Sequence, residues 1–383
     1  MRLKKNCQEQ DLNSKVRSHV FPALQFFVLL FFSMFDFYKS GYRIFDISAF
    51  ALILLFVLTC IRLKSIRASS LILLLVACVY TIAGLFSSEK NSTPLALFFN
   101  CFLFFLLLLK EFKPSQKQIE LVLVIHLFFF FFQFSYFYAT GNIANYHWFT
   151  DIDPRLESTI FRPAGLFYEP AIYCYAMFML TTMLDSRHSK YGVLEALVMV
   201  SMVVSVSLLG FVFAALILIR LVSKNKLIAP ILCVLPIIFA SGELIKTMST
   251  FVENRLFDLG SDASADGRYG NIQEIFSNEN LIYHLFGRGF GASFDQFGSS
   301  GASASISAVG ILGVALFSGW LLLKSRELMV GILSLVAIMI SAPIFTYGIF
   351  PYWIANIVSH SSRLSSLGWR KRQSGLRSKS IGT

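Results

Sequence analysis

Long apolar runs recur along the whole chain, separated by short polar and charged segments. A helix that crosses a bilayer needs about 20 mostly apolar residues. Two apolar stretches, 193–222 and 328–360, are each too long for a single span. Runs that reach or nearly reach the length of one span lie at 20–38, 44–61, 69–87, 94–109, 119–139, 166–184, 227–242 and 305–323. This pattern predicts a polytopic bundle of transmembrane helices.

The distribution of Lys and Arg decides how the two longest stretches are divided, because positive residues concentrate in the cytoplasmic segments of membrane proteins. If each stretch is a pair of short helices, split near 207–210 and near Pro343–Pro351, most of the 33 Lys and Arg residues fall on the cytoplasmic side. A single span at 193–222 would instead place Lys224 and Lys226 outside. We therefore expect an all-α integral membrane fold of about twelve helices.

The same count places both termini in the cytoplasm, with an N-terminal segment at 1–19 and a basic tail at 362–383. The first apolar run, 20–38, is too long for a signal-peptide core and no cleavage site follows it, so we interpret it as an uncleaved span. No internal repeat or low-complexity linker is visible. Residues 1–383 are therefore expected to form a single membrane domain.

Composition agrees with this interpretation and argues against several function classes. The chain is 56% hydrophobic and 14% charged, whereas soluble domains carry about a quarter charged residues. The net charge of +11 lies in short clusters between apolar runs, where it orients helices among membrane lipids and does not indicate a nucleic-acid partner. Of the 6 cysteines, Cys7 lies in the N-terminal segment and the others within apolar runs, without a CxxC pair. We expect neither a disulfide framework nor a zinc site.

Two of the connections are long, and both are predicted to lie outside: 140–165 and 243–304. Long loops in compact proteins are usually functional or disordered. Within the second loop, 271–276 and 281–286 carry apolar residues at helical spacing. Such spacing is typical of amphipathic helices that lie flat on a membrane surface. We expect such an interfacial helix in the second loop.

The outer side of the membrane restricts the chemistry that these loops can perform. No ATP or nucleotide-sugar pool is present there, and the sequence contains no phosphate-binding loop of the Walker type. An enzyme on that side needs an activated substrate, and a lipid diphosphate that carries a sugar chain meets this need. Arginine matches diphosphate oxygens with a planar fork of donors, although the same cations could instead bind lipid headgroups or loop acids. The main outside cations are Arg155, Arg162, Lys246, Arg255, Arg268 and Arg288.

Several local sequences carry a family resemblance. One is Arg162–Pro170 (RPAGLFYEP), directly before a span; others are Asp266-Gly267-Arg268 and Leu285–Gly291 (LFGRGFG). The span that follows contains Gly310 and Gly313 at Gly-x-x-Gly spacing. In this order, the motifs resemble the O-antigen ligase and polymerase superfamily, in particular Wzy-type O-antigen polymerases, over roughly residues 140–345.

The resemblance implies a glycosyltransferase in a bacterial inner membrane, with the two long loops in the periplasm. Its substrate would be an undecaprenyl-diphosphate-linked oligosaccharide, whose growing glycan passes to the next repeat unit without a metal ion or other cofactor. Carried over by position, Arg162 and Arg268 would bind the diphosphate. Glu169 would be a general base for the acceptor hydroxyl or would orient Arg162; alternatively, it caps the following helix. Whether a chain-length regulator is a partner stays open.

Further residues are candidates for substrate binding. Arg288 and Arg255 would add positive charge around the diphosphate. His284 would serve as an acid or base group, or is an ordinary interfacial histidine. His126, inside an expected span, is either functional or a histidine bonded within the bundle.

Two alternatives to a polymerase are considered. Ligases of this superfamily carry a His just before the helix that we expect to begin near Ser305, and here the sequence is Ala302–Ser307 (ASASIS); this favours a polymerase. A flippase for lipid-linked oligosaccharides would usually show repeats, short loops and central charges, so the two long outside loops favour surface catalysis. Asp151 and Asp153 match the acidic pair of metal-dependent glycosyltransferases, a short match that is common by chance.

Overall fold

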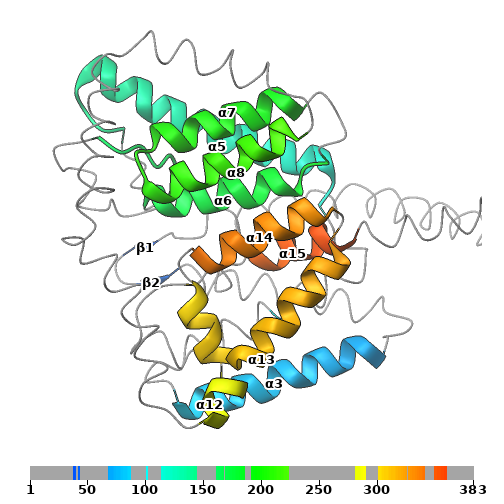
Figure 1. Ribbon diagram of the computed structural model, residues 1–383. Helices are drawn as coiled ribbons and strands as arrows, with labels where there is room; N and C mark the ends of the chain where they lie inside the picture. Colours follow the sequence, from blue (N-terminus) through cyan, green and yellow to red (C-terminus); the bar gives the residue numbers. More distant parts are fainter. Residues whose placement is uncertain are drawn as a thin grey trace, which may run out of the picture. The chain divides into compact units, whose positions relative to one another are not determined.

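In the computed structural model, the described part of the chain is helical apart from two strands of two residues each (Figure 1). The strands β1 (Tyr38–Lys39) and β2 (Tyr42–Arg43) pair antiparallel. The helices are α3 (Ala68–Ser87), α5 (Gln116–Thr140), α6 (Pro170–Met183), α7 (Tyr191–Val204), α8 (Leu208–Val222), α12 (Leu281–Phe286), α13 (Gly301–Lys324), α14 (Leu328–Ile340) and α15 (Ile349–Ser359). The structure describes residues 38–39, 42–43, 68–87, 101, 114–144, 161–167, 169–185, 191–223, 281–289, 301–325, 327–340 and 349–359. The predicted all-α class is confirmed for this part of the chain.

Two of the described helices are long and apolar enough to cross a membrane: α5, and residues Ala302–Lys324 of α13. The 25 residues of α5 extend about 37 Å at 1.5 Å per residue, more than the ~30 Å of a bilayer's hydrocarbon core. The expected spans at 44–61 and 227–242 lie outside the described residues, as do those at 20–38 and 94–109 apart from Tyr38 and Cys101. The count of about twelve spans therefore stays a prediction.

The chain forms two compact units. Unit 1 comprises Met1–Arg67, Leu109–Asp262 and Tyr347–Ile349, and contains α5 to α8. Unit 2 comprises Ala68–Leu108, Ala263–Thr346 and Phe350–Thr383. Each unit is described by itself below.

The predicted division of 193–222 is confirmed in unit 1. Helix α7 ends at Val204 and α8 begins at Leu208, so the chain turns at residues 205–207. The two helices run antiparallel, because Arg220 near the end of α8 lies 3.4 Å from Glu195 near the start of α7. They have 14 and 15 residues, which gives each about 21–23 Å, less than the ~30 Å of a hydrocarbon core.

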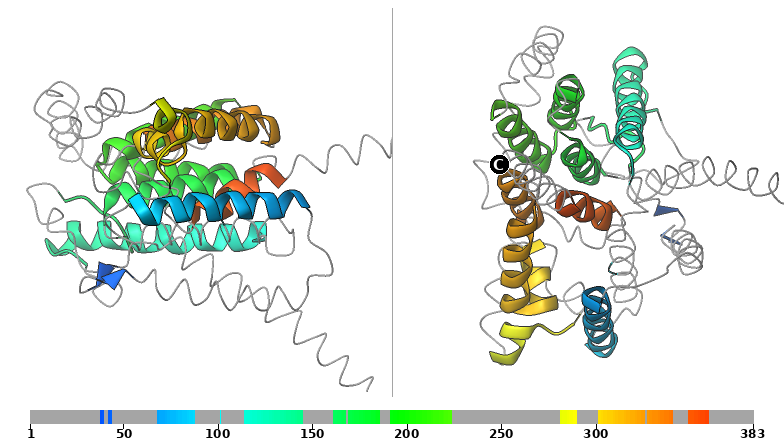
Figure 2. Two further views of the ribbon diagram at one scale, coloured as in Figure 1. Left: turned by 90° about the horizontal axis from the view of Figure 1, so that it is seen from below. Right: turned by 90° about the vertical axis from the view of Figure 1, so that its right-hand side faces the viewer.

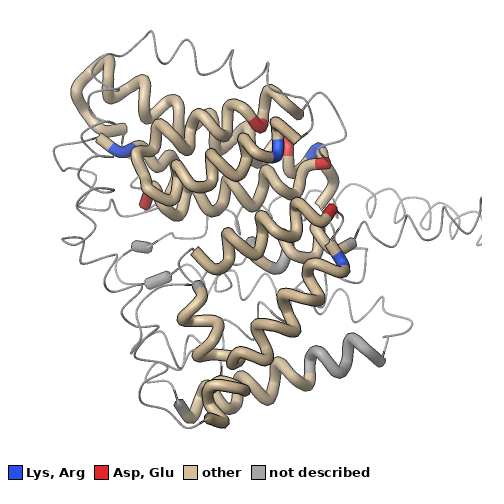
Figure 3. The backbone as a smooth tube through the Cα atoms, in the orientation of Figure 1, with Lys and Arg blue, Asp and Glu red and all other residues tan. Residues whose placement is uncertain are grey.

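The helix directions alternate through unit 1. Gln116 at the start of α5 donates from Nε2 to the carbonyl of Met183 at the end of α6 (3.3 Å). At the other end of α5, the rings of Phe137 and Phe161 stack 4.0 Å apart, and Phe161 lies shortly before α6 in the chain. The four helices pack with nearly parallel axes (Figures 1 and 2). Unit 1 therefore has two polar ends, which we call the Arg162 end and the Arg220 end, and its described charged residues gather at both (Figure 3).

In unit 2, helix α13 is broken at Gly310, where φ is 70° and ψ is 174°. A break leaves the last carbonyls of the first half without helical partners. The segment after α12 supplies donors: the Arg288 amide bonds to the Ser307 carbonyl (2.8 Å) and the Gly289 amide to the Ala308 carbonyl (3.1 Å). The expected span at 305–323 thus exists as two helical pieces, and α13 begins at Gly301 rather than near Ser305.

Close backbone approach explains why glycines occupy this junction. A Cβ on Gly310 would collide with the backbone of Leu285, and a Cβ on Gly287 would lie 2.6 Å from the Ala308 carbonyl carbon. Both glycines also have positive φ, 70° and 78°, which other residues adopt at a cost. Farther along, the stretch 328–360 contains α14 and α15, with residues 341–348 outside the described part.

Candidate functional site

A single buried amide on α5 holds the Arg162–Pro170 motif in place. The Gln133 Oε1 atom accepts hydrogen bonds from the amides of Ala164 and Gly165, both at 2.9 Å. Its Nε2 atom donates to the carbonyl of Ala144 at 3.2 Å. Because unpaired polar groups are costly inside an apolar bundle, this side chain fixes the motif to the helix. Sequence reasoning missed Gln133, although a lone amide in the run FFFFFQF was the available signal.

The one glycine of the motif, Gly165, is required by geometry. Gly165 has a φ of 60°, and a Cβ there would lie 3.3 Å from the Phe130 backbone nitrogen. The turn is closed by a hydrogen bond from the Phe167 amide to the Ala164 carbonyl (3.1 Å). The motif can therefore lie directly against the α5 backbone.

Aromatic packing fills the space beneath the motif. The centroid of the Phe167 ring lies 5.0 Å from that of His126 and 5.6 Å from that of Tyr173. Tyr173 in turn stacks on Phe130, with 4.6 Å between the ring centroids. His126 is buried. His126 therefore lies inside the packed interior of unit 1, against the ring of Phe167.

Arg162 is anchored to the turn between α7 and α8. Its Nε atom donates a 3.0 Å hydrogen bond to the carbonyl of Val206. A 3.2 Å hydrogen bond between Cys174 Sγ and Ser205 Oγ ties this turn to α6, and the Tyr173 hydroxyl, which donates to Ser201 Oγ at 2.7 Å, ties the end of α7 to the same helix. The guanidinium is therefore seated on packed helices, although its own side chain is only partly buried.

Glu169 stands immediately before α6, at its N-cap position. Its backbone is extended (φ −133°, ψ 139°) and its carbonyl accepts from the Tyr173 amide (3.1 Å), but its side chain makes no capping hydrogen bond. Glu169 therefore occupies the N-cap position expected of a helix cap, without the capping hydrogen bond from its carboxylate. The structure places Glu169 and Arg162 together at the Arg162 end of unit 1, with the carboxylate at the positive end of a helix dipole.

Two further candidates lie in unit 2. The predicted helix at 281–286 is present as α12, and its Leu281, Ile282 and Phe286 side chains are exposed, as expected for an interfacial helix. Half-buried His284 lies on this helix. The Arg288 guanidinium carbon lies 5.6 Å from the centre of the Tyr283 ring, a cation–π contact.

The remaining candidates, Arg255 and Arg268, lie outside the described residues, as do Asp151, Asp153 and 271–276. Arg162 and Glu169 thus lie in unit 1, and His284 and Arg288 in unit 2. Within the described ranges, no group of three or more His, Cys, Asp and Glu side chains is arranged to hold a metal ion. The described cysteines Cys78, Cys101 and Cys174 are free thiols.

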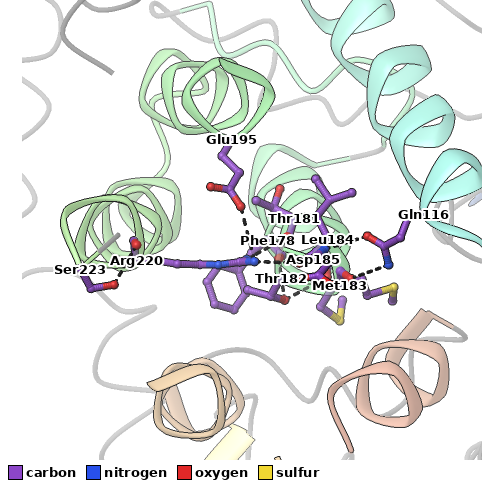
Figure 4. A network of polar contacts seen from close by, with 11 residues as sticks. Gln116, Phe178, Thr181, Thr182, Met183, Leu184, Asp185, Glu195, Arg220 and Ser223 are labelled. Atoms are coloured by element: carbon purple, nitrogen blue, oxygen red, sulfur yellow. Dashed lines mark hydrogen bonds and ion pairs between the residues drawn. The ribbon is translucent and has the colours of Figure 1, made fainter. Parts of the chain in front are cut away.

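The Arg220 end of unit 1 contains a polar network that sequence reasoning missed (Figure 4). Arg220, which is 1% exposed, donates from its two terminal nitrogens to the carbonyls of Thr181 (2.8 Å) and Leu184 (2.9 Å). Fully buried Glu195 lies 3.4 Å from the same guanidinium. The signal was two charges inside the apolar stretch 193–222, since such charges must find partners. Arg220 thereby satisfies the last carbonyls of α6.

No protein-family model, no curated protein and no solved structure matches this chain. In its described part, the structure is helical and contains two helices long and apolar enough to span a membrane. Its best-defined candidate site is the Arg162 end of unit 1.

Proposed function

We propose that this protein is a polysaccharide polymerase of a bacterial inner membrane, with many spans and both termini in the cytoplasm. It would transfer a growing glycan from one undecaprenyl-diphosphate-linked repeat unit to the next on the periplasmic side. One observation supports this most directly: Arg162, seven residues before the N-cap residue Glu169 of α6, is anchored through Nε to the Val206 carbonyl (3.0 Å).

An anchored arginine suits a diphosphate for a geometric reason. A guanidinium is a rigid planar fork, so fixing Nε also fixes the edge formed by its two terminal nitrogens. Through that edge an arginine contacts two phosphate oxygens at once. Side chains held in advance stabilise developing charge without reorganising during the reaction. Arg162 would therefore bind the diphosphate, with Arg268, Arg255 and Arg288 adding positive charge.

The proposed reaction is a displacement at the anomeric carbon of the donor. The acceptor hydroxyl oxygen forms the new bond to this carbon, and the bond from carbon to diphosphate oxygen breaks. The electron pair leaves on the diphosphate, whose added negative charge Arg162 and Arg268 would stabilise. Glu169, the N-cap residue of α6, would take the hydroxyl proton. His284 is the alternative acid or base group.

One observation favours a second candidate, a flippase for the same lipid-linked substrates. Broken helices often form the binding sites of transporters, and α13 is broken at Gly310. In this protein, however, the break is covered by the backbone of Arg288 and Gly289, which donate to Ser307 and Ala308. A ligase would attach the glycan to a different acceptor, and no described contact favours it over a polymerase.

Elongation in detergent separates these functions. Purified protein would be mixed with undecaprenyl-diphosphate-linked repeats in micelles, where no sealed membrane exists and a flippase has nothing to transport across. We expect longer lipid-linked glycans with wild type and a loss of at least about 100-fold with Arg162→Ala, the size typical of removing one group that stabilises developing charge. Lys117→Ala, which removes an exposed cation from the other end of unit 1, is the matched control and should retain activity. If folded wild-type protein does not elongate the lipid-linked repeats, the polymerase proposal is contradicted.

A further inference from the structure

Val206, between α7 and α8, has an unusual backbone conformation. Its φ is 48°, and it is the one non-glycine residue with positive φ in the described part of the chain. A β-branched residue in this left-handed region is a clear outlier. Such conformations persist only where the surrounding structure enforces them, and they gather at functional sites.

The neighbouring residues enforce this conformation. The Val206 amide donates to the Val203 carbonyl (3.2 Å), and the Ser205 amide to the Ser201 carbonyl (2.9 Å). Ser205 Oγ also donates to the Met202 carbonyl (2.6 Å) and is hydrogen-bonded to Cys174 Sγ on α6. Val206 itself is only 1% exposed. The turn is therefore held both from α7 and from α6.

The conformation determines where the Val206 carbonyl points. In a continuing helix, each carbonyl points along the axis toward the amide four residues later. Left-handed φ at residue 206 takes this carbonyl out of the helix pattern, and it accepts the hydrogen bond from Arg162 Nε, 44 residues earlier in the chain. The unfavourable backbone and the arginine contact are thus two parts of one arrangement.

We propose that Val206 is a positioning residue for Arg162: its strained backbone carbonyl fixes the guanidinium for binding the diphosphate of a lipid-linked substrate. This inference rests on the proposed function, and deepens it by assigning a role to a residue that never touches the substrate. It also assigns the role to the backbone. A side chain that tolerates left-handed φ should therefore preserve binding, and one that forbids it should not.

The test measures the affinity of purified full-length protein for undecaprenyl diphosphate in detergent. Val206→Asn keeps the carbonyl in place, because Asn tolerates left-handed φ, and should bind as wild type does. Val206→Pro fixes φ near −65° and should bind about tenfold more weakly, the order expected for loss of one hydrogen bond to a charged group. In an Arg162→Ala background, Val206→Pro should change the remaining affinity by less than about twofold, as expected when both changes remove the same interaction.

The outcomes separate this inference from the proposed function. If wild type and Arg162→Ala bind undecaprenyl diphosphate equally weakly, the proposed function fails and the inference with it. If Arg162→Ala loses binding but Val206→Pro binds as wild type does, the inference alone is overturned; an equal loss from Val206→Pro in both backgrounds also overturns it. Should Val206→Pro not fold, a glycine inserted between Val206 and Ser207 lengthens the turn instead. This insertion should weaken binding of undecaprenyl diphosphate about as much when Arg162 is present, and should have little effect in the Arg162→Ala background.

Discussion

Arg220 and Glu195 form a buried ion pair between the end of α8 and the start of α7, with 3.4 Å between guanidinium nitrogen and carboxylate oxygen. The same guanidinium donates to two carbonyls at the end of α6. One side chain therefore joins three helices of unit 1 at the end opposite Arg162. Because the pair is buried, its partners depend on each other for stability.

Removing only Arg220 should destabilise the protein strongly. Arg220→Met leaves the Glu195 carboxylate buried without its counter-charge and removes the guanidinium hydrogen bonds to the Thr181 and Leu184 carbonyls; breaking such a pair costs about 3–5 kcal/mol. The unfolding midpoint in detergent would measure the loss. The double variant Arg220→Met with Glu195→Leu removes both charges and should recover part of the stability. If the double variant is less stable than the single one, the ion pair does not account for the effect.

Gln133→Leu should detach the Arg162–Pro170 motif from α5. The change leaves two buried amides without an acceptor, at about 1–3 kcal/mol for each unsatisfied group. We expect both a lower unfolding temperature and a loss of elongation activity. Phe132→Leu, next to it but on the exposed side of α5, is the matched control and should change neither by much. Equal effects of the two substitutions would contradict the anchoring role of Gln133.

Gly310→Ala should disturb the junction between α13 and the 287–289 segment. The new Cβ would collide with the Leu285 backbone, and Ala disfavours the φ of 70°. We expect a loss of stability above about 1 kcal/mol and faster proteolysis near residues 287–289. Gly319→Ala is the control within the same helix, because nothing lies within 4 Å of its added Cβ; it should be neutral or stabilising by up to about 1 kcal/mol. Matching results for both glycines would show that the break is not needed.

Glu169→Gln should separate catalysis from helix capping. Gln keeps the size and shape of the side chain and no capping hydrogen bond is lost, so the free energy of unfolding should change by less than about 0.5 kcal/mol. Elongation should fall about 100-fold or more if the carboxylate accepts the hydroxyl proton. Ser115→Ala provides the contrast. Ser115 forms a complete capping box with Gln118 at the start of α5, so its loss should cost about 1 kcal/mol of stability without affecting the chemistry. A Glu169→Gln protein with full activity would exclude the general-base role.

Sequence alone predicted the elements of unit 1 better than their contacts. The turn at 205–207 was predicted from Lys224 and Lys226. Placing these two lysines in the cytoplasm requires the stretch 193–222 to cross the membrane twice, and therefore to turn in the middle. The break at Gly310 did not follow, since apolar residues continue through it and a hydropathy pattern does not distinguish one straight helix from two pieces that meet at a kink. Gln133, Glu195 and Arg220 were missed for a related reason: each is polar within an apolar run, and its partners come from other helices. Arg162 and Glu169 were found through a motif, yet the Val206 carbonyl that holds Arg162 belongs to no sequence pattern.

The polymerase proposal makes its clearest prediction in cells. In a deletion strain, surface polysaccharide on a gel should show a core carrying a single repeat, because repeats are still made, transported and attached but no longer joined. Wild type should restore a long ladder, and Arg162→Ala or Arg268→Ala at verified equal expression should not, since each removes a cation proposed to stabilise the leaving diphosphate. A deletion strain with core and no repeat would instead favour a ligase or flippase, because both act on every repeat that reaches the core. An unchanged ladder would contradict all three, unless a second enzyme duplicates the activity, and purified-protein elongation distinguishes that case.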